Sequence, residues 1–446
     1  MQFELTCLDY HTGSQRNKAG LVESTDQSLC SANVIYPVHA QDITDEAMIS
    51  FKNHCVIARY VDRQYDKLWG QTGAKRGTTI NLRYPPQYEL RRGDTAQPQG
   101  SNESFFPVTL GSPTGVDLDF TSQEMLLTVD DFMRRFVKPA GLPVANGVDS
   151  DLAKLYKKVP NYVGTPGTPA TALDTYLQIT EKLAANGAPI DDSGETWAMI
   201  TDYRSNRPII TDLRGLFNPQ GVISKQFDSA RMGNAIGYRW SQDQNIAIYT
   251  TGAFGTGTPL VNGANQSGAS INVDGAGTVT NYWREGDVIN FAGVNGIKAN
   301  SVELGGSGES TGILKDFVVT ADVSSVAAGF AVAISPSIVL SGPTQNVTGA
   351  PADNAAITTF GAVNTYGSVS ARNNLAFHKT AFVLGMVDLP LPGGMDMAAR
   401  TVDEDQKFSM RFLRGFDITE NVFISRLDCL YVAACPRPEF AGRVMC

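Results

Sequence analysis

Apolar residues recur at helical spacing in the first half of the chain. A helix is predicted within DITDEAMISFKNHCVIARYVDRQYDKLW, where Asp42 or Thr44 can serve as the N-cap and the apolar spacing continues to Tyr60. Two more are predicted within residues 128–158, and the prolines and glycine of KPAGLP should break or kink the helical pattern between them. The clearest helix is TALDTYLQITEKLAANGAP, whose apolar residues share one stripe and whose Asn-Gly pair forms a stop. A last helix is predicted over SNRPIITDLRGLFNP, with Ser205 as its cap.

A two-residue alternation predicts strands on either side of a long polar segment. Ile80 and Leu82 alternate with polar residues, and so do the apolar residues of VDLDF at 116–120. The segment between them is rich in Gln, Asn and Ser. We interpret residues 79–118 as a long two-stranded arm with a polar tip. Because an isolated hairpin of this length is marginally stable in water, we expect it to have no partner in its own chain and to be ordered by lying across a second copy.

The pattern of the chain changes at about residue 236. Short strand-like segments then follow one another, with Gly, Ser, Asn and Thr between them: IAIYT, SINV, TVTNYW, DVINFAGV, DFVVTADV and FAVAISPSIVL. This spacing predicts a small barrel or sandwich. Longer strand patterns follow in AFVLGMVDLPLP, KFSMRFLRGF and VFISRLDCLYVAAC. Helices before the small strands and long strands after them imply that this β domain is inserted into an α/β body.

Composition narrows the class of protein. The 446 residues are 42% hydrophobic, which is enough for packed cores, but only 18% charged, as expected of a surface that neighbours cover. The net charge of −9 argues against a dedicated nucleic-acid binder, because such binding needs a basic face, but it permits a protein that encloses nucleic acid. No apolar stretch approaches the ~20 residues that cross a bilayer, and MQFELTCLDYHTGSQ is not a secretory signal. The six cysteines form no CxxC pair and are expected to be free thiols in a reducing compartment.

The sequence offers little chemistry. The four histidines, His11, His39, His54 and His378, lack metal-site spacing, and neither a GxSxG motif nor a P-loop is present. The glycine-rich GGSGES follows no strand-to-helix unit of the dinucleotide-binding kind. Asp117 and Asp119 are expected on a solvated strand face, DED at 403–405 in a surface loop, and Arg-Gly-Asp at 92–94 in the turn of the arm. We therefore predict no catalytic residue, no cofactor, no metal site and no enzymatic activity.

The order of these parts, together with six motifs, resembles a known family. The motifs are RQYDKLWGQTGAKRGTTINLRYP, TVDDFMRRFVKPA, LRGLFNPQGVISKQF, GDVINFAGV, NLAFHKTAFVLGMVDL and SRLDCLYVAACPRPEFAGRV. The chain from about residue 44 to its end resembles the major capsid proteins of tailed bacteriophages. These have the Hong Kong 97-like fold, and the likeness is to the short-tailed-phage coat proteins with an inserted β-barrel domain. The resemblance implies an α+β fold.

The resemblance also implies a division of the chain into domains. The expected parts are an N-terminal extension (1–43), an N-arm (44–78), an extended loop (79–118), a peripheral domain with a spine helix (119–169), an axial domain in two parts (170–235 and 346–400), a β-barrel insertion domain (236–345) and closing peripheral strands (401–446). In this family the extended loop lies over the neighbouring subunit. Candidate inter-subunit contacts are therefore Arg83, Tyr84, Arg91, Arg92, Asp94, Phe105 and Phe106.

The function implied is that of a structural subunit. Copies of the chain would assemble as hexamers and pentamers into the icosahedral head that encloses a double-stranded DNA genome without binding it specifically. Scaffolding and portal proteins are implied partners, with a decoration protein as a further one, and no membrane is involved. The expected location is the virion, assembled in the cytoplasm of the host bacterium.

Two features depart from some relatives. The stretch from Gln244 to Val273 has no charged residue, so any contact that it makes between capsomers needs hydrogen bonds and packing. Between Lys75 and Lys138 there is no lysine for a covalent link from the extended loop, which predicts a shell held non-covalently. The alternative is a glycan-binding or adhesin-like β-rich surface protein, and a hydrolase with dispersed residues is a third possibility. The predicted helices count against the adhesin.

Overall fold

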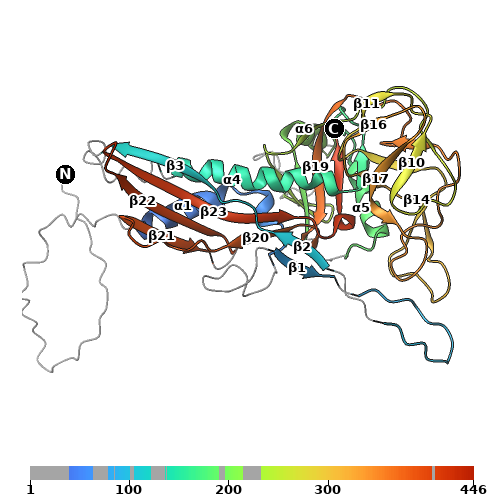
Figure 1. The fold of residues 1–446 in the computed structure, drawn as a ribbon, viewed down its shortest axis with the longest axis horizontal. Helices are drawn as coiled ribbons and strands as arrows, with labels where there is room; N and C mark the ends of the chain where they lie inside the picture. The colour runs from blue at the N-terminus through green and yellow to red at the C-terminus, as the bar shows by residue number, and fades with distance from the viewer. Residues whose placement is uncertain are drawn as a thin grey trace, which may run out of the picture. The chain divides into compact units, whose positions relative to one another are not determined.

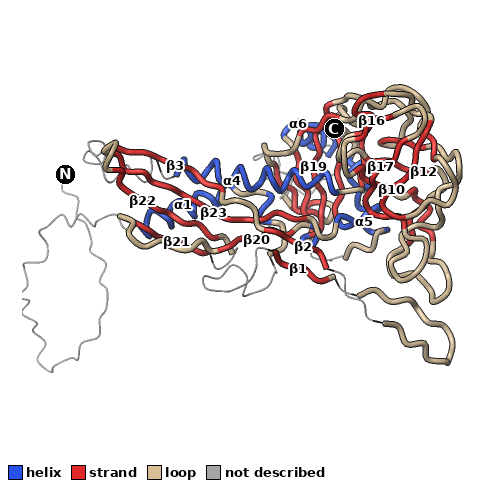
Figure 2. The backbone as a smooth tube through the Cα atoms, viewed as in Figure 1, coloured by secondary structure: helices blue, strands red, loops and turns tan. Residues whose placement is uncertain are grey.

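The computed structural model describes residues 40–63, 79–84, 86–100, 105–121, 136, 138–189, 196–213, 233–403 and 407–446. These residues belong to one compact unit of α+β type, with several helices and a majority of strands (Figures 1 and 2). The predicted N-terminal extension lies outside the described residues up to residue 39.

The described helices differ from prediction at their ends. Helix α1 (Ala40–His54) stops at His54 and a separate 3₁₀ turn follows at Ile57–Arg59, although the predicted spacing continued to Tyr60. Helix α1 also begins before both predicted caps, and the Thr44 hydroxyl donates to the Ala40 carbonyl at 2.7 Å, one turn back, so Thr44 is inside the helix. Helix α6 (Tyr203–Leu213) starts after Asp202 rather than at Ser205. The carboxylate of Asp202 accepts from the N–H of Arg204 at 3.3 Å, so Asp202 takes the capping role.

KPAGLP was predicted to break or kink a helix, and the break is wrong because all six residues lie within one helix. Helix α4 (Lys138–Ala153) contains Pro139 in its first turn and Pro143 within it, and a 3₁₀ turn (Lys154–Lys158) continues it. The first N–H groups of a helix have no partner within it, so Pro139, which has no N–H, loses no hydrogen bond in the first turn. Pro143 loses only the one hydrogen bond that its position would make to a carbonyl of the first turn. The helix predicted from Thr128 lies outside the described residues except for position 136.

Helix α5 (Leu173–Ala185) confirms the clearest of the predicted helices. Its buried stripe is Tyr176, Ile179 and Leu183, whereas Leu177 is 42% exposed. The chain leaves the helix through Gly187, whose φ of +77° lies in the left-handed region that favours glycine. The buried stripe packs against Trp240 and other core residues of a mixed sheet.

This seven-stranded sheet joins segments from five parts of the chain. Its order is β4 (Asn161–Gly164), β24 (Ala441–Met445), β19 (Ser370–His378), β5 (Trp197–Thr201), β7 (Tyr238–Gln242) and β6 (Asn234–Ala235), with β8 (Ile248–Thr250) also pairing with β19. The β24–β4 and β5–β7 pairs are parallel. Strand β5 is TWAMIT less its first residue, and all of it is buried, as its apolar run predicts.

A second, antiparallel sheet has five strands. Its order is β20 (Val383–Val387), β23 (Val422–Ala434), β22 (Ser409–Asp417) and β21 (Met397–Val402), with β3 (Thr114–Thr121) also pairing with β23. Helices α1 and α4 pack against it and against each other (Figure 1), and Phe51 of α1 meets Phe408 edge-on, with ring centroids 4.8 Å apart. Asp149 of α4 accepts from the N–H groups of Val56 and Ala58 at 2.6 and 2.9 Å. One carboxylate thus joins α4 to the end of α1.

The pairing of β3 corrects the predicted arm. Strand β1 (Thr79–Arg83) pairs with β2 (Phe105–Thr109), not with VDLDF. VDLDF is a strand as predicted, but it lies in β3, where residue 120 is the register partner of Phe423 in β23. Alternation identifies a strand and its faces but carries no information on which strand lies beside it.

The small strands of residues 236–345 do not all lie in one sheet. A six-stranded sheet has the order β18 (Ile357–Thr359), β12 (Val288–Phe291), β15 (Phe317–Val319), β17 (Phe330–Ile338), β10 (Gly268–Asp274) and β9 (Leu260–Val261). A bridge between Leu260 and Ala356 brings its two ends together, so this sheet is nearly closed. Strands β7 and β8, within the predicted 236–345, pair in the seven-stranded sheet, and β18 lies beyond residue 345. Two further two-stranded sheets come from the same part of the chain as the six-stranded sheet: β11 (Val279–Trp283) with β16 (Val323–Ser325), and β13 (Asn295–Ile297) with β14 (Ser310–Leu314).

Two glycine substitutions should have opposite effects on stability. A Cβ on Gly115 of β3 would lie 2.3 Å from the carbonyl oxygen of Leu427, so Gly115→Ala must shift the β3–β23 pair. We expect a loss of about 2 kcal/mol in the free energy of unfolding. Gly147 in α4 has open space around the same position, so Gly147→Ala should gain about 0.5–1 kcal/mol. Urea unfolding of both variants checks this, and equal effects would contradict the close packing of β3 on β23.

Asp149 should make stability depend on pH. Burial raises its pKa from 3.8 to about 6, although the N–H groups of Val56 and Ala58 act in the opposite direction. Because the folded-state pKa lies above the unfolded one, this group's contribution is fully present below pH 4 and is lost as the pH rises through 6. The wild type should therefore lose on the order of 2 kcal/mol between pH 4 and 7 relative to Asp149→Asn. Unfolding at both pH values measures the difference. Asp119→Asn, at an exposed position on β3, is the control. The prediction would be contradicted if the stability difference between the wild type and Asp149→Asn were the same at pH 4 and pH 7.

Candidate subunit-contact surface

The base of the extended loop is a short ladder with an anchored exit. The hydroxyls of Thr79 and Thr109 lie 3.0 Å apart across the β1–β2 pair, and Val108 is buried. At the end of β1, the Tyr84 hydroxyl donates to the carbonyl oxygen of Pro436, and its ring meets Phe106 edge-on at 6.4 Å. Burial raises the pKa of Tyr84 to about 12. Of the predicted contact residues, Tyr84 thus fixes the loop to its own body, and Phe106 packs against Tyr84.

Other predicted contact residues at the base face outward. Arg83 is exposed at the end of β1, and Phe105 opens β2 with 53% of its surface exposed, because it alternates with Phe106 along the strand. Beyond this base, residues 86–100 form no ladder of their own, and most of them are exposed. Among them, Tyr88 and Leu90 are large and about half exposed, at 50% and 52%. Large apolar side chains that are exposed together are typical of a protein interface.

The tip of the loop is a charged turn. The Arg91 guanidinium donates to the carbonyl of Gly93 and, at 2.9 Å, to that of Thr95, which closes the turn around Gly93 with its φ of +106°. Asp94 is exposed in this turn, as its place in the Arg-Gly-Asp sequence predicts. Arg92 forms an ion pair with Glu303, with 2.6 Å between Nε and Oε1.

The loop also has a partner in its own chain, which corrects the expectation that it has none. The N–H of Leu90 donates to the carbonyl of Val302 at 2.9 Å, and the N–H of Leu304 donates to the carbonyl of Leu90 at 3.0 Å. Leu90 and Glu303 are partners in a parallel β-bridge. Residues 302–304 were not predicted as a contact, since main-chain pairing between distant segments leaves no periodic signal in the sequence.

A buried carboxylate explains the motif GDVINFAGV. Asp287 is fully buried, and the Tyr249 hydroxyl donates to its Oδ1 at 2.7 Å. The N–H groups of Gly252 and Arg284 donate to Oδ2 at 3.0 and 2.8 Å. Burial raises the pKa of Asp287 to about 6, while the three donors lower it. The aspartate thus holds together the turn before β12 and the chain that leaves β8.

A buried arginine lies on the other side of this turn. Arg443 of β24 is fully buried, and its Nη2 donates to the carbonyl of Gly286 at 2.6 Å. Gly286 has a φ of +100°, so the turn that presents this carbonyl favours glycine. The guanidinium lies 5.7 Å from the centre of the Tyr156 ring. Through separate hydrogen bonds to the same turn, Asp287 and Arg443 link the six-stranded sheet to the seven-stranded one. In the sequence, the only sign of this contact was the charged residue within FAGRVMC.

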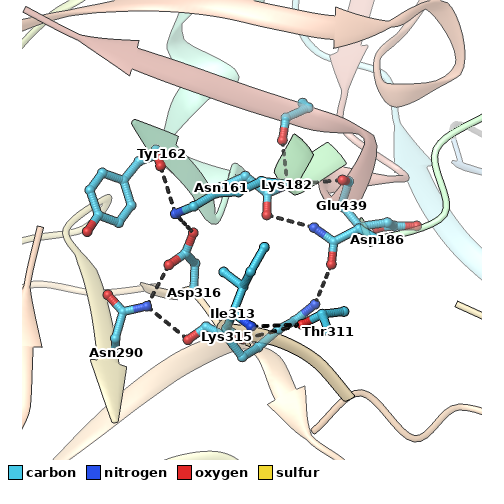
Figure 3. A network of polar contacts seen from close by, with 11 residues as sticks. Asn161, Tyr162, Lys182, Asn186, Asn290, Thr311, Ile313, Lys315, Asp316 and Glu439 are labelled. Carbon is cyan, nitrogen blue, oxygen red and sulfur yellow. Dashed lines mark hydrogen bonds and ion pairs between the residues drawn. The ribbon is translucent and has the colours of Figure 1, made fainter. Parts of the chain in front are cut away.

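A second polar network joins the same two sheets (Figure 3). The Lys182 ammonium of α5 lies 2.7 Å from Oδ2 of Asp316, whose side chain is 5% exposed, and the Asn290 amide donates to Oδ1 of the same carboxylate at 2.5 Å. Lys315 donates to Oδ1 of Asn186 at 2.8 Å, and burial lowers the pKa of Lys315. Buried ion pairs of this kind set a unique orientation between packed parts more than they add stability.

The deciding comparison is with protein families. The family described as "P22 coat protein - gene protein 5" matches residues 38–446, nearly the whole chain. The chain belongs to the P22 coat protein family. It is a structural major capsid protein of a tailed bacteriophage, as the motifs predicted, and the match does not favour the glycan-binding alternative.

Solved structures similar to this coat protein include phage capsids. One described as Mycobacterium phage Che8 is 9% identical, with a TM-score of 0.43, covering 87% of this chain and 90% of the other. The mature capsid of bacteriophage PhiM1 is 10% identical (TM-score 0.40, covering 83% and 82%), and the capsid of cyanophage P-SCSP1u is 9% identical (0.38, 83% of both). No curated protein matches.

The other candidates for chemistry in the coat protein were the histidines, Asp117 and the cysteines. His54 contacts the carbonyl of Ser50 at 2.7 Å, and His378 packs on Trp197; His11 and His39 lie outside the described residues. Asp117 lies 3.7 Å from Arg426 on an exposed face. Within the described ranges, no group of three or more His, Cys, Asp or Glu could hold a metal ion. The cysteines that are described are free and buried: Cys55, Cys429, Cys435 and Cys446. Among the helices that the structure describes, none is long and apolar enough to span a bilayer.

Proposed function

We propose that this coat protein assembles with copies of itself into the icosahedral head that encloses the double-stranded DNA genome of a tailed bacteriophage. The proposal is carried by the structure of the extended loop. Its base is anchored by Tyr84, while Tyr88, Leu90 and Phe105 remain about half exposed to water. A second subunit beneath the loop would cover that surface. At about 25 cal/mol per Å², a few hundred Å² per contact gives a gross gain near 10 kcal/mol, most of it offset by lost freedom.

The parts of the fold correspond to those of a Hong Kong 97-like subunit. We assign the five-stranded sheet with α1 and α4 to the peripheral domain and the seven-stranded sheet with α5 and α6 to the axial domain. The nearly closed six-stranded sheet is the inserted β-barrel. Strand membership supports boundaries for the insertion near residues 252 and 360 in place of 236 and 345, because β8 ends before the first and β18 ends at Thr359. The extended loop is then residues 79–113, since β3 belongs to the peripheral sheet.

The proposed shell is held non-covalently and carries no catalytic activity. The absence of lysine between Lys75 and Lys138 supports the first point, since the loop offers no amine for a covalent link. The net charge of −9 supports enclosure of DNA by confinement rather than by specific binding. Hexamers and pentamers of the coat protein would form the head, with a scaffolding protein, a portal and a decoration protein as further partners. Assembly in the host bacterial cytoplasm would make the coat protein a virion component.

Electron microscopy of the purified coat protein tests the proposal. The protein is expressed alone and with a scaffolding protein, separated on a sucrose gradient and imaged. Closed particles of capsid size, or rings of five and six subunits, are the expected result. A folded protein that stays monomeric under both conditions would refute the shell.

A further inference from the structure

The loop segment Leu90–Arg92 is bound in the structure by a main-chain edge of the insertion. The edge is Val302–Leu304, which lies between β13 and β14 and supplies one carbonyl and one N–H to Leu90 at 2.9 and 3.0 Å. The Arg92–Glu303 ion pair lies beside these bonds at 2.6 Å. Val302 is itself buried, so the edge is packed into its own domain.

The closed loop is weakly held. The side chains of the ion pair are 73% and 43% exposed, and exposed pairs contribute little to stability. The two main-chain bonds replace bonds to water, and ordering of the loop opposes them. Closure on its own chain is therefore readily reversed.

Closure also leaves the loop's apolar surface uncovered. With Leu90 docked, about half of its surface remains exposed, as do half of Tyr88 and of Phe105. The edge thus forms hydrogen bonds with the main chain of the loop but leaves the apolar side chains of the loop exposed. A second copy carries the same edge together with a further surface, so the loop can keep its main-chain bonds there and bury its apolar side chains as well.

We propose that Val302–Leu304 is the docking edge for Leu90–Arg92, filled by the subunit's own loop in the free subunit and by the loop of a second copy in the shell. This inference rests on the proposed function. Exchange of identical segments between copies needs no new surface, because each subunit carries both halves of the contact. Closure on the own chain then holds free subunits apart until a neighbour displaces the loop.

Disulfide trapping tests the exchange. Leu90 and Glu303 are bridge partners, and paired strands lie about 5 Å apart, which suits a disulfide. In a background with Cys7 and Cys30 replaced by serine, Leu90→Cys subunits are assembled with Glu303→Cys subunits and oxidised with diamide, which takes up the two hydrogens of the thiols. A 90–303 link between chains, identified by peptide mass mapping, is expected in the particles. The double variant Leu90→Cys/Glu303→Cys should form the link within one chain when it is free.

A matched control and a second variant pair make the outcome decisive. Arg91→Cys with Glu303→Cys should give at least about tenfold less of the link, because residue 91 is not the bridge partner. If the cysteine variants do not fold or assemble, charge reversal replaces them. Arg92→Glu and Glu303→Arg each break the ion pair in both the free and the assembled state. A mixture of the two should assemble about two- to fivefold faster than either variant alone, because it pairs opposite charges only between chains. Restoration only when both changes are in one chain would overturn the exchange.

The two levels of failure can be told apart. If the wild type forms no particles, the proposed function fails and the inference falls with it. Particles whose 90–303 link stays within each chain, or which show no such link at all, overturn the exchange alone. Particles with links between chains, from protein whose free form links within the chain, support both.

Discussion

Asp287→Ala should lower the free energy of unfolding by roughly 3–5 kcal/mol, the largest stability effect expected of a single substitution here. It leaves the Tyr249 hydroxyl and the N–H groups of Gly252 and Arg284 without their acceptor in a fully buried turn. It also removes the nearby negative charge from the buried Arg443. The variant no longer buries a carboxylate, and this gain in stability offsets only part of the loss. Urea unfolding measures the total, and hydrogen exchange should show the faster opening in β12 and β15.

Asp322→Ala is the matched control for this prediction. Asp322 also accepts a main-chain N–H in the same region, from Glu285 at 2.8 Å, but it makes this bond at an exposed position. Its removal should cost about 1 kcal/mol or less, because water can replace the lost acceptor. A similar small effect for both variants would show that Asp287 does not organise the junction between the two sheets.

Replacement of residues 86–100 by a four-residue Gly-Ser linker should abolish assembly while the subunit stays folded. Most of the removed residues are exposed, so the unfolding midpoint should stay close to that of the wild type. The apolar surface that Tyr88 and Leu90 would bury on a neighbour is lost. A loss of about 1.4 kcal/mol per contact already lowers association tenfold, and a shell repeats each contact many times. Sucrose gradients and electron microscopy should therefore detect no particles under conditions where the wild type forms them.

Gln97→Ser is the control for the loop replacement. It changes one exposed residue of the tip and leaves the length of the loop and its apolar residues intact. Particle yield should match that of the wild type. Wild-type yield from the linker variant would contradict the role of the extended loop, whereas loss of folding, seen by circular dichroism, would show that residues 86–100 contribute to the subunit's own stability.

The sequence predicted most strands and the best of the helices because their periodicity is local. In α5, Tyr176, Ile179 and Leu183 are buried where the stripe placed them. Helix starts were less accurate, since Ser205 and Asp202 both have capping side chains, and only the structure shows that the Asp202 carboxylate accepts from the N–H of Arg204. The prolines of α4 were misjudged because their cost depends on how close they lie to the helix start.

The candidate contact residues divided in a way that spacing alone could not reveal. Tyr84 and Phe106 were grouped with Arg92 and Phe105 because all lie in one loop. Their roles differ because Tyr84 finds the carbonyl of Pro436, more than 300 residues away in the chain. Lys182 and Asp316 are likewise joined only in the folded chain. No pattern within a window of 20 residues contains such pairs.

The sequence by itself determined the family, the α+β class, the faces of the strands and the polar, exposed tip of the loop. All of these depend on residue type and on neighbours within a few positions. The tertiary structure alone decided that VDLDF pairs with β23, that the small sheet nearly closes through Leu260 and Ala356, and that Leu90 rests on the edge at Val302–Leu304. The physical reason is that main-chain hydrogen bonds are the same for every residue, so partner choice is set by the packing of the whole chain.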